Sequence, residues 1–100
     1  YHRGLMKLPK VQLELNYQFR DERDENVALV EVKNPSESLA FFVHLALTQG
    51  EDGAEVAPTY WSDNYFSLLP GQNKLVRGVF AEEDLQGAAA VVKMDGWNVK

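Results

Sequence analysis

The stretch LAFFVHLALTQ, residues 39–49, is apolar at almost every position and has turn-forming residues on both sides. Its run of Phe-Phe-Val favours an extended strand over a helix of the same length. Because both faces of such a strand are apolar, we expect it to lie at the centre of the fold. The two predicted faces are Phe41, Val43, Leu45 and Leu47 on one side, and Ala40, Phe42, His44 and Ala46 on the other.

Segments on either side of this strand alternate between apolar and polar residues with a period of two, which predicts strands with one buried face. The clearest is VQLELNYQF at residues 11–19, followed by residues 27–34, 73–80 and 88–97, with a short extended piece at 56–61 whose Pro58 suits a sheet edge. The expected inward residues are Val11, Leu13, Leu15, Tyr17 and Phe19; Ala28, Val30 and Val32; Val76, Gly78 and Phe80; and Ala90, Val92 and Met94.

Turn signals separate these segments at intervals of about ten residues, which is the spacing of an all-β sandwich. They include Asn34-Pro35 and Pro70-Gly71, and a short helical turn is expected near residues 82–87. A longer helix over AEEDLQGAAA, residues 81–90, is the alternative reading of that part. The count is about seven short strands in two antiparallel sheets.

The overall composition argues against several classes of binding partner. One hundred residues fit one domain, and the net charge of −5 with a pI of about 4.9 supplies no basic surface for nucleic acid or for an anionic membrane. The absence of cysteine excludes disulfides and thiolate metal sites. Residues 1–10 are predicted to form a linker from a preceding domain, and the start at Tyr1 indicates a piece of a longer protein.

Groups that could carry catalysis are scarce. His44 has no second histidine nearby outside the predicted linker, the serines lack a nucleophile-elbow motif, and no glycine-rich phosphate loop is present. Glycoside hydrolysis needs two carboxyl groups, and the acids here lie mostly in turns, apart from Asp63 between Trp61 and Tyr65. We therefore predict no catalytic residue, no metal ligand and no cofactor.

The stretch YWSDNYF, residues 60–66, gathers four aromatic rings around one acid. Three uses are open from spacing alone: a corner of the core, a surface that docks another domain, or a platform on which sugar rings stack. Asp63-Asn64 suits a turn in which the Asp63 carboxylate accepts backbone N–H bonds. The candidate site residues are Tyr60, Trp61, Asp63, Asn64 and Tyr65.

SDNYFSLLPGQNK at 62–74, preceded by NPSESLAFFVHLAL at 34–47 and followed by DGWN at 95–98, resembles the carboxy-terminal immunoglobulin-like domain of family two glycoside hydrolases, in particular β-mannosidases and exo-β-glucosaminidases. The resemblance covers residues 11–98. Gly78 departs from it, because a β-branched residue is usual there, and this predicts a β-bulge.

The resemblance implies a retaining two-carboxylate mechanism whose glutamates lie on a separate (β/α)8 barrel, so none of them transfers to this chain. We therefore expect a seven-stranded antiparallel immunoglobulin-like sandwich over residues 11–100, non-catalytic, that packs against other domains of a retaining exo-β-glycosidase. A periplasmic or secreted parent is implied. The rival hypotheses are a carbohydrate-binding module that stacks an oligosaccharide on Tyr60, Trp61 and Tyr65, and a fibronectin-type spacer.

Overall fold

The structure is a computed structural model that describes residues 9–23 and 25–100. In this part of the chain it contains seven strands and one 3-10 turn, and no α-helix. Most of the linker predicted over residues 1–10 lies outside the described residues. The strands are β1 (Glu14–Glu22), β2 (Glu25–Lys33), β3 (Ala40–Gln49), β4 (Tyr60–Trp61), β5 (Phe66–Leu68), β6 (Asn73–Phe80) and β7 (Ala90–Asp95), and the turn is η1 (Glu82–Leu85).

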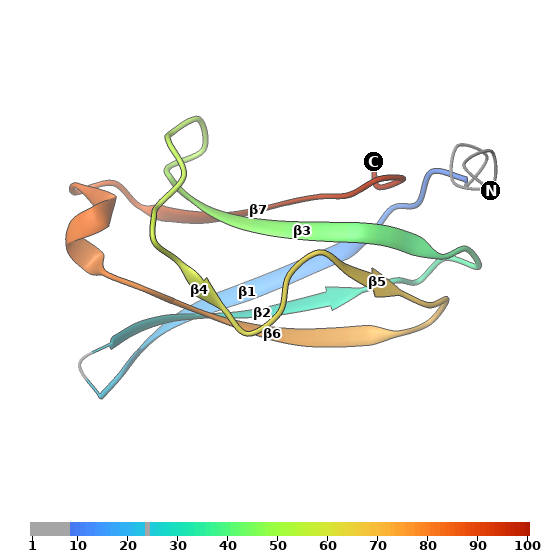
Figure 1. The fold of residues 1–100 in the computed structure, drawn as a ribbon, viewed down its shortest axis with the longest axis horizontal. Helices are drawn as coiled ribbons and strands as arrows, with labels where there is room; N and C mark the ends of the chain where they lie inside the picture. Colours follow the sequence, from blue (N-terminus) through green and yellow to red (C-terminus); the bar gives the residue numbers. More distant parts are fainter. Residues whose placement is uncertain (1–8, 24) are drawn as a thin grey trace.

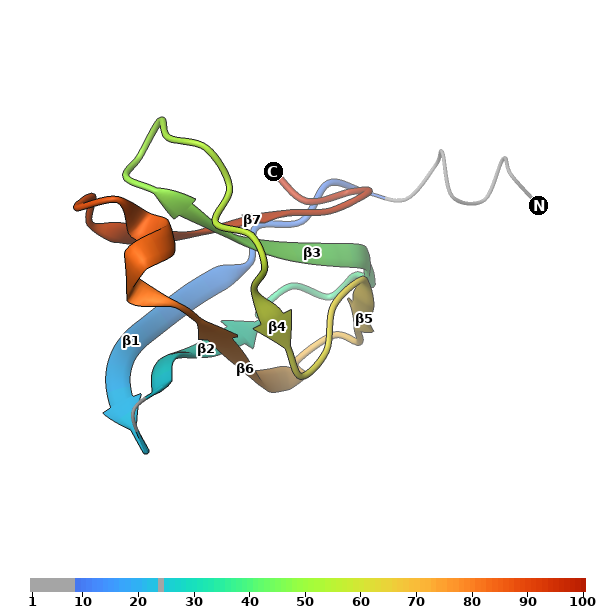
Figure 2. The same ribbon diagram turned by 60° about the vertical axis from the view of Figure 1, so that its left-hand side comes forward.

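The strands form two sheets that face each other (Figures 1 and 2). One sheet has the order β1-β2-β6-β4 and the other the order β5-β3-β7, with every neighbouring pair antiparallel. The predicted seven-stranded sandwich is therefore confirmed, and the strand at residues 39–49 is the central strand of its sheet. The helix over residues 81–90 was the wrong alternative, because η1 is only four residues long and the positive φ of Gln86 and Gly87 ends it before β7.

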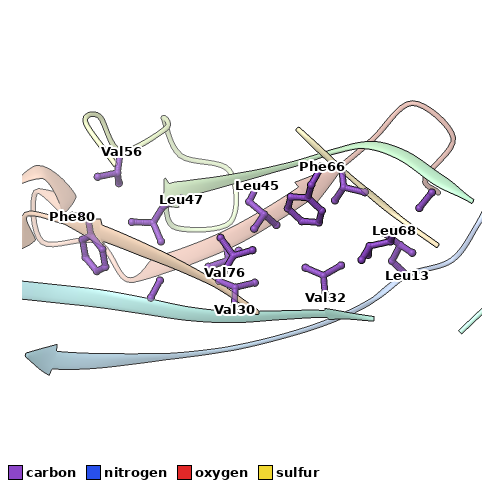
Figure 3. Close-up of a cluster of buried hydrophobic side chains, with 14 of the residues drawn as sticks. Leu13, Val30, Val32, Leu45, Leu47, Val56, Phe66, Leu68, Val76 and Phe80 are labelled. Carbon is purple, nitrogen blue, oxygen red and sulfur yellow. The ribbon is translucent and has the colours of Figure 1, made fainter. Parts of the chain in front are cut away.

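Apolar side chains from both sheets fill the space between them (Figure 3). β2 contributes Val30 and Val32, and β3 contributes Leu45 and Leu47, all fully buried. Removing each such side chain from water stabilises the fold by about 1.5–3 kcal/mol. The inward stripes predicted for β2, β6 and β7 are confirmed by this core.

The stripe predicted for residues 11–19 is only half right. Val11 and Leu13 are buried, but β1 begins after them at Glu14, and Tyr17 and Phe19 are 40% and 42% exposed. The reason is that β1 is the edge strand of its sheet. The β2 partners of these two residues, Val30 and Ala28, are fully buried, so the core ends sideways at β1. The two rings meet edge to face, 5.6 Å apart, and Phe19 continues to Phe80 at 6.1 Å, so they form the rim of the core.

A β-bulge breaks the predicted alternation at the start of β3. The pairing of β3 with β5 shifts register between Ala40 and Val43, and Phe42 adopts a left-handed backbone with φ of 52°. Ala40 consequently faces the core together with Val43, whereas the predicted stripe placed it on the opposite face. A left-handed conformation costs a non-glycine residue about 1–2 kcal/mol.

Candidate interaction site

Residues 61–66 carry the chain from one sheet to the other. They begin in β4, which pairs with β6, and end in β5, which pairs with β3 (Figure 2). A segment that changes sheets leaves the hydrogen-bond ladder of the first before it joins the second, so its polar groups need other partners. The side chains of this crossover supply them.

Trp61 occupies the space that a side chain on residue 78 would need. Gly78 lies directly opposite Trp61 in the β4–β6 pair, and a Cβ atom at Gly78 would stand 2.6 Å from Cζ3 of the indole ring. The register of β6 against β2 is continuous through Gly78. The predicted bulge is therefore wrong, and the glycine instead admits the indole ring onto the inner face of the sheet.

Ser62 and Asp63 fasten the crossover to β6. The Ser62 N–H donates to the Arg77 carbonyl at 2.7 Å, and the Ser62 hydroxyl accepts from the Arg77 N–H at 2.9 Å. The Asp63 carboxylate meets the Lys74 ammonium at 2.7 Å and accepts the Asn64 N–H at 2.8 Å, as the predicted turn requires. The bond from Lys74 is the main cause that lowers the pKa of Asp63. A general acid at neutral pH needs the opposite shift.

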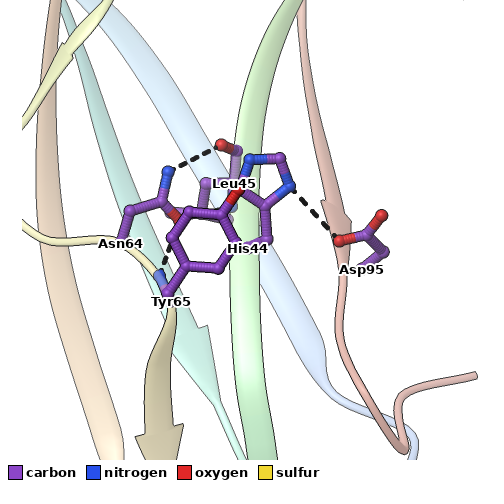
Figure 4. Close-up of polar contacts among 5 residues, drawn as sticks. All are labelled: His44, Leu45, Asn64, Tyr65 and Asp95. Atoms are coloured by element: carbon purple, nitrogen blue, oxygen red, sulfur yellow. Dashed lines mark hydrogen bonds and ion pairs between the residues drawn. The ribbon is translucent and has the colours of Figure 1, made fainter.

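The side chain of Asn64 pairs with β3 as the backbone of a neighbouring strand would. Its side-chain Oδ1 accepts the Leu45 N–H at 2.8 Å, and its Nδ2 donates to the Leu45 carbonyl at 3.0 Å (Figure 4). The same oxygen accepts the Tyr65 N–H at 3.0 Å. The amide thus extends the edge of the sheet by one hydrogen-bonded pair before the start of β5.

Tyr65 stacks on His44 across the outer face of the second sheet, with ring centroids 4.7 Å apart and planes 18° apart. The other side of His44 is held by Asp95, whose Oδ1 lies 3.3 Å from Nδ1 (Figure 4). Tyr65 takes a left-handed backbone with φ of 54°, and its ring is exposed. Tyr65 is therefore a surface aromatic side chain whose ring is positioned by its stack on His44.

The five predicted site residues are close in the chain but do not form one surface. Tyr60 and Trp61 are successive residues of β4 and so point to opposite faces of the four-stranded sheet, while Tyr65 lies on the other sheet. Trp61 packs against the core and Asn64 pairs with β3, so both support the crossover from inside. Asp63 is exposed and supports it through its surface ion pair with Lys74. The structure leaves the rings of Tyr60 and Tyr65 exposed, in separate places.

Two further asparagines play the role of Asn64 elsewhere. The sequence predicted a turn at Asn34 but had not singled out Asn98. Buried Asn34 donates to the carbonyls of Ser38 and Leu68. Buried Asn98 accepts the Phe41 N–H at 2.9 Å and donates to the carbonyls of Pro9 and Leu39. Asparagine carries a donor and an acceptor on one short amide, which lets it replace a backbone unit at a chain reversal.

A hollow of about 520 Å³ lies on the outer face of the four-stranded sheet. Leu29 and Leu75 form its apolar part, and Gln18, Glu31 and Arg77 are among its polar side chains. Among the residues that line it, Glu31 is the sole carboxylate, whereas glycoside hydrolysis needs two. Within residues 9–23 and 25–100, no three His, Asp or Glu side chains gather as metal ligands, and no helix is long and apolar enough to span a membrane.

Comparisons with known proteins, by family model and by sequence, lead to the same group of glycosidases. The family model described as the exo-β-D-glucosaminidase Ig-fold domain matches residues 1–99. A mannosylglycoprotein endo-β-mannosidase of Lilium longiflorum is 33% identical over an alignment of 86 positions, which covers 80% of this chain and 9% of that protein. An exo-β-D-glucosaminidase of Streptomyces avermitilis is 39% identical over 61 residues, which are 61% of this chain and 6% of that protein.

The fold has a solved counterpart of the same kind. The crystal structure of the exo-chitosanase CsxA of Amycolatopsis orientalis superposes with a TM-score of 0.88 and 28% identity, over 96% of this chain and 12% of that one. The chain therefore spans about a tenth of the length of the proteins that it matches.

Proposed function

Because the chain belongs to the family of exo-β-D-glucosaminidase Ig-fold domains, we propose that it serves as a non-catalytic accessory domain of a retaining exo-β-glycosidase. The substrate class of that enzyme is β-glucosaminides or β-mannosides. In this proposal the domain packs against its neighbours in the same polypeptide and stabilises them, and residues 1–10 connect it to the domain before it.

The observation that carries the proposal is that the family model matches residues 1–99, while the relatives that this chain matches are many times longer than it is. The internal use of the crossover side chains supports it. Asp63 is paired with Lys74 and Asn64 with Leu45, so these groups hold the sandwich together and are already engaged. Such a domain would act in an enzyme by packing its surface against the neighbouring domains and so stabilising them.

The predicted site residues divide by role in this proposal. Trp61 and Asn64 hold the crossover in shape from within, and Asp63 holds it through its surface ion pair with Lys74. Tyr60 and Tyr65, 68% and 64% exposed, are the two that keep a ring available for contact with another domain. Tyrosine suits such a seam, because its ring packs while its hydroxyl remains hydrated.

Deletion of residues 11–100 from the multidomain enzyme tests the proposal. We expect the truncated enzyme to unfold or inactivate at a lower temperature than the intact one, because exposed apolar surface is left where the domain packed. Turnover of a chromogenic β-D-glucosaminide or β-D-mannoside, measured per folded molecule well below that temperature, reports any effect on the catalytic domain. Unchanged stability together with unchanged turnover would refute a supporting role.

A further inference from the structure

Two phenylalanine rings at the start of β3 stack on each other although they are neighbours in the sequence. The centroids of Phe41 and Phe42 are 4.2 Å apart, with planes at 26°. Successive side chains of a regular strand point to opposite faces, so such a stack requires the bulge and the left-handed backbone of Phe42. The consequence of this unfavourable backbone is that both rings are displayed together, with Phe42 49% exposed.

The backbone beneath this ring pair is held firmly by the last residues of the chain. The Phe41 N–H donates to Oδ1 of Asn98 at 2.9 Å, and the Phe41 carbonyl accepts the Trp97 N–H at 2.9 Å. Asn98 is 2% exposed, so its bonds are shielded from water. The position of the rings is thus set before any partner arrives, which reduces the entropy lost on docking.

The same asparagine also fixes the point at which the chain enters the domain. Nδ2 of Asn98 donates to the Pro9 carbonyl at 2.9 Å, and the Asn98 carbonyl accepts the Val11 N–H at 2.8 Å. The Val11 carbonyl in turn accepts the Lys100 N–H at 3.0 Å. In Figure 1 the first described residues, the end of β7 and the beginning of β3 all lie at one end of the sandwich.

We propose that the Phe41–Phe42 pair is the docking surface for the domain that precedes this one in the polypeptide, an inference that rests on the proposed accessory function. A domain attached through residue 9 is tethered next to the rings, so it meets them at high effective concentration and needs little intrinsic affinity. Aromatic side chains are the residues enriched where proteins meet. A partner with a complementary apolar recess is the one that fits them.

The outer hollow at Leu29 and Leu75 is the competing surface. It lies on the other sheet, and neither the chain entrance nor a tether points to an occupant there. Leu75 is 76% exposed and so provides a matched probe of that face. The two surfaces make opposite predictions for the same measurement.

Hydroxyl-radical footprinting of side chains, followed by mass spectrometry, compares the isolated 100-residue chain with the multidomain enzyme. We expect modification of Phe42 to fall severalfold in the enzyme while modification of Leu75 stays the same. The reverse pattern, or equal modification of Phe42 in both proteins, would overturn the assignment.

A pair of variants tests whether the contact matters. Phe42→Asn removes the ring with a residue that tolerates a left-handed backbone, and Leu75→Asn is the matched control. After each variant is corrected for its effect on the isolated chain, Phe42→Asn should lower the inactivation temperature of the enzyme and Leu75→Asn should not. If neither does, while deletion of residues 11–100 still destabilises the enzyme, this docking surface is wrong and the accessory function stands. If the deletion is also silent, both fail.

Discussion

The side-chain amide of Asn64 makes both of the hydrogen bonds that a neighbouring strand would make to Leu45. Leu45 is a fully buried residue of the central strand, and β5 begins too late to pair with it, since its first residue, Phe66, lies opposite Val43. A single side chain therefore continues the sheet at the place where the chain crosses between sheets. Backbone groups in such a position are costly to leave unpaired, so this amide is a main support of the crossover.

Replacement of Asn64 by alanine should destabilise the isolated chain by about 2 kcal/mol, because the Leu45 N–H and carbonyl lose their partners. Asn64→Asp is a sharper variant, since a carboxylate still accepts the N–H but cannot donate to the carbonyl. Urea denaturation gives both free energies. Asn16→Ala, at an exposed asparagine of β1, is the control and should be nearly neutral. Equal effects at positions 16 and 64 would contradict this role.

Gly78→Ala should also destabilise the chain, by about 1–3 kcal/mol, because the new methyl group would overlap the indole ring of Trp61. Without that ring, alanine in a strand is normally the more favourable residue. In a double-mutant cycle with Trp61→Leu, we therefore expect the destabilisation caused by Gly78→Ala to shrink or change sign when Trp61 is already replaced by leucine. A cost that is the same in both backgrounds would show that Trp61 is not the obstacle.

The ion pair of Asp63 predicts a specific titration. Hydrogen bonding from Lys74 lowers the pKa of Asp63 below its ordinary value of about 3.9. The pair therefore stabilises the fold above that value, and the contribution is lost as the pH falls through the lowered pKa. NMR titration of the carboxyl carbon should show this low midpoint, and it should rise in Lys74→Met. Lys93→Met, which removes a different ion pair to Glu51, should leave it unchanged.

Asn98→Ala should loosen the end of the sandwich at which the chain enters. The substitution removes the partner of the Phe41 N–H and the donor to the carbonyls of Pro9 and Leu39. We expect a loss of about 3 kcal/mol in the free energy of unfolding and faster hydrogen exchange at the Phe41 amide. Asn73→Ala, at an exposed position of β6, is the control. Unaltered exchange at Phe41 would exclude this role for Asn98.

The sequence predicted most of the architecture because burial imposes a period of two on each strand. That rule correctly placed Val30 and Val32, and likewise Val43, Leu45 and Leu47. It failed at Ala40, which is buried, and at Phe41, which stacks on the exposed Phe42, because a bulge adds a residue to one strand and exchanges the faces. It also failed at Tyr17 and Phe19, because alternation shows which face a residue takes but not where the opposing sheet ends.

The site was harder to predict because its contacts join distant parts of the chain. The sequence marked Trp61 as notable and Gly78 as unusual, yet only their pairing across β4 and β6 explains both. The roles of Asn64 and Asn98 rest on bonds to residues 19 and 57 positions away. Local composition carries no information about such partners, although the two asparagines lie in the segments SDNYF, residues 62–66, and DGWN, residues 95–98, that carry the family resemblance.

We propose that the crossover at residues 61–66 acts by holding the sandwich together within a larger enzyme. The most direct test is Gly78→Ala in the multidomain glycosidase, because this substitution adds only one methyl group and places it against the indole ring of Trp61. We predict a lower temperature of inactivation, with turnover of a chromogenic β-D-glucosaminide per folded molecule unchanged at low temperature. Reduced turnover with an unchanged inactivation temperature would place this segment at the substrate and contradict the account.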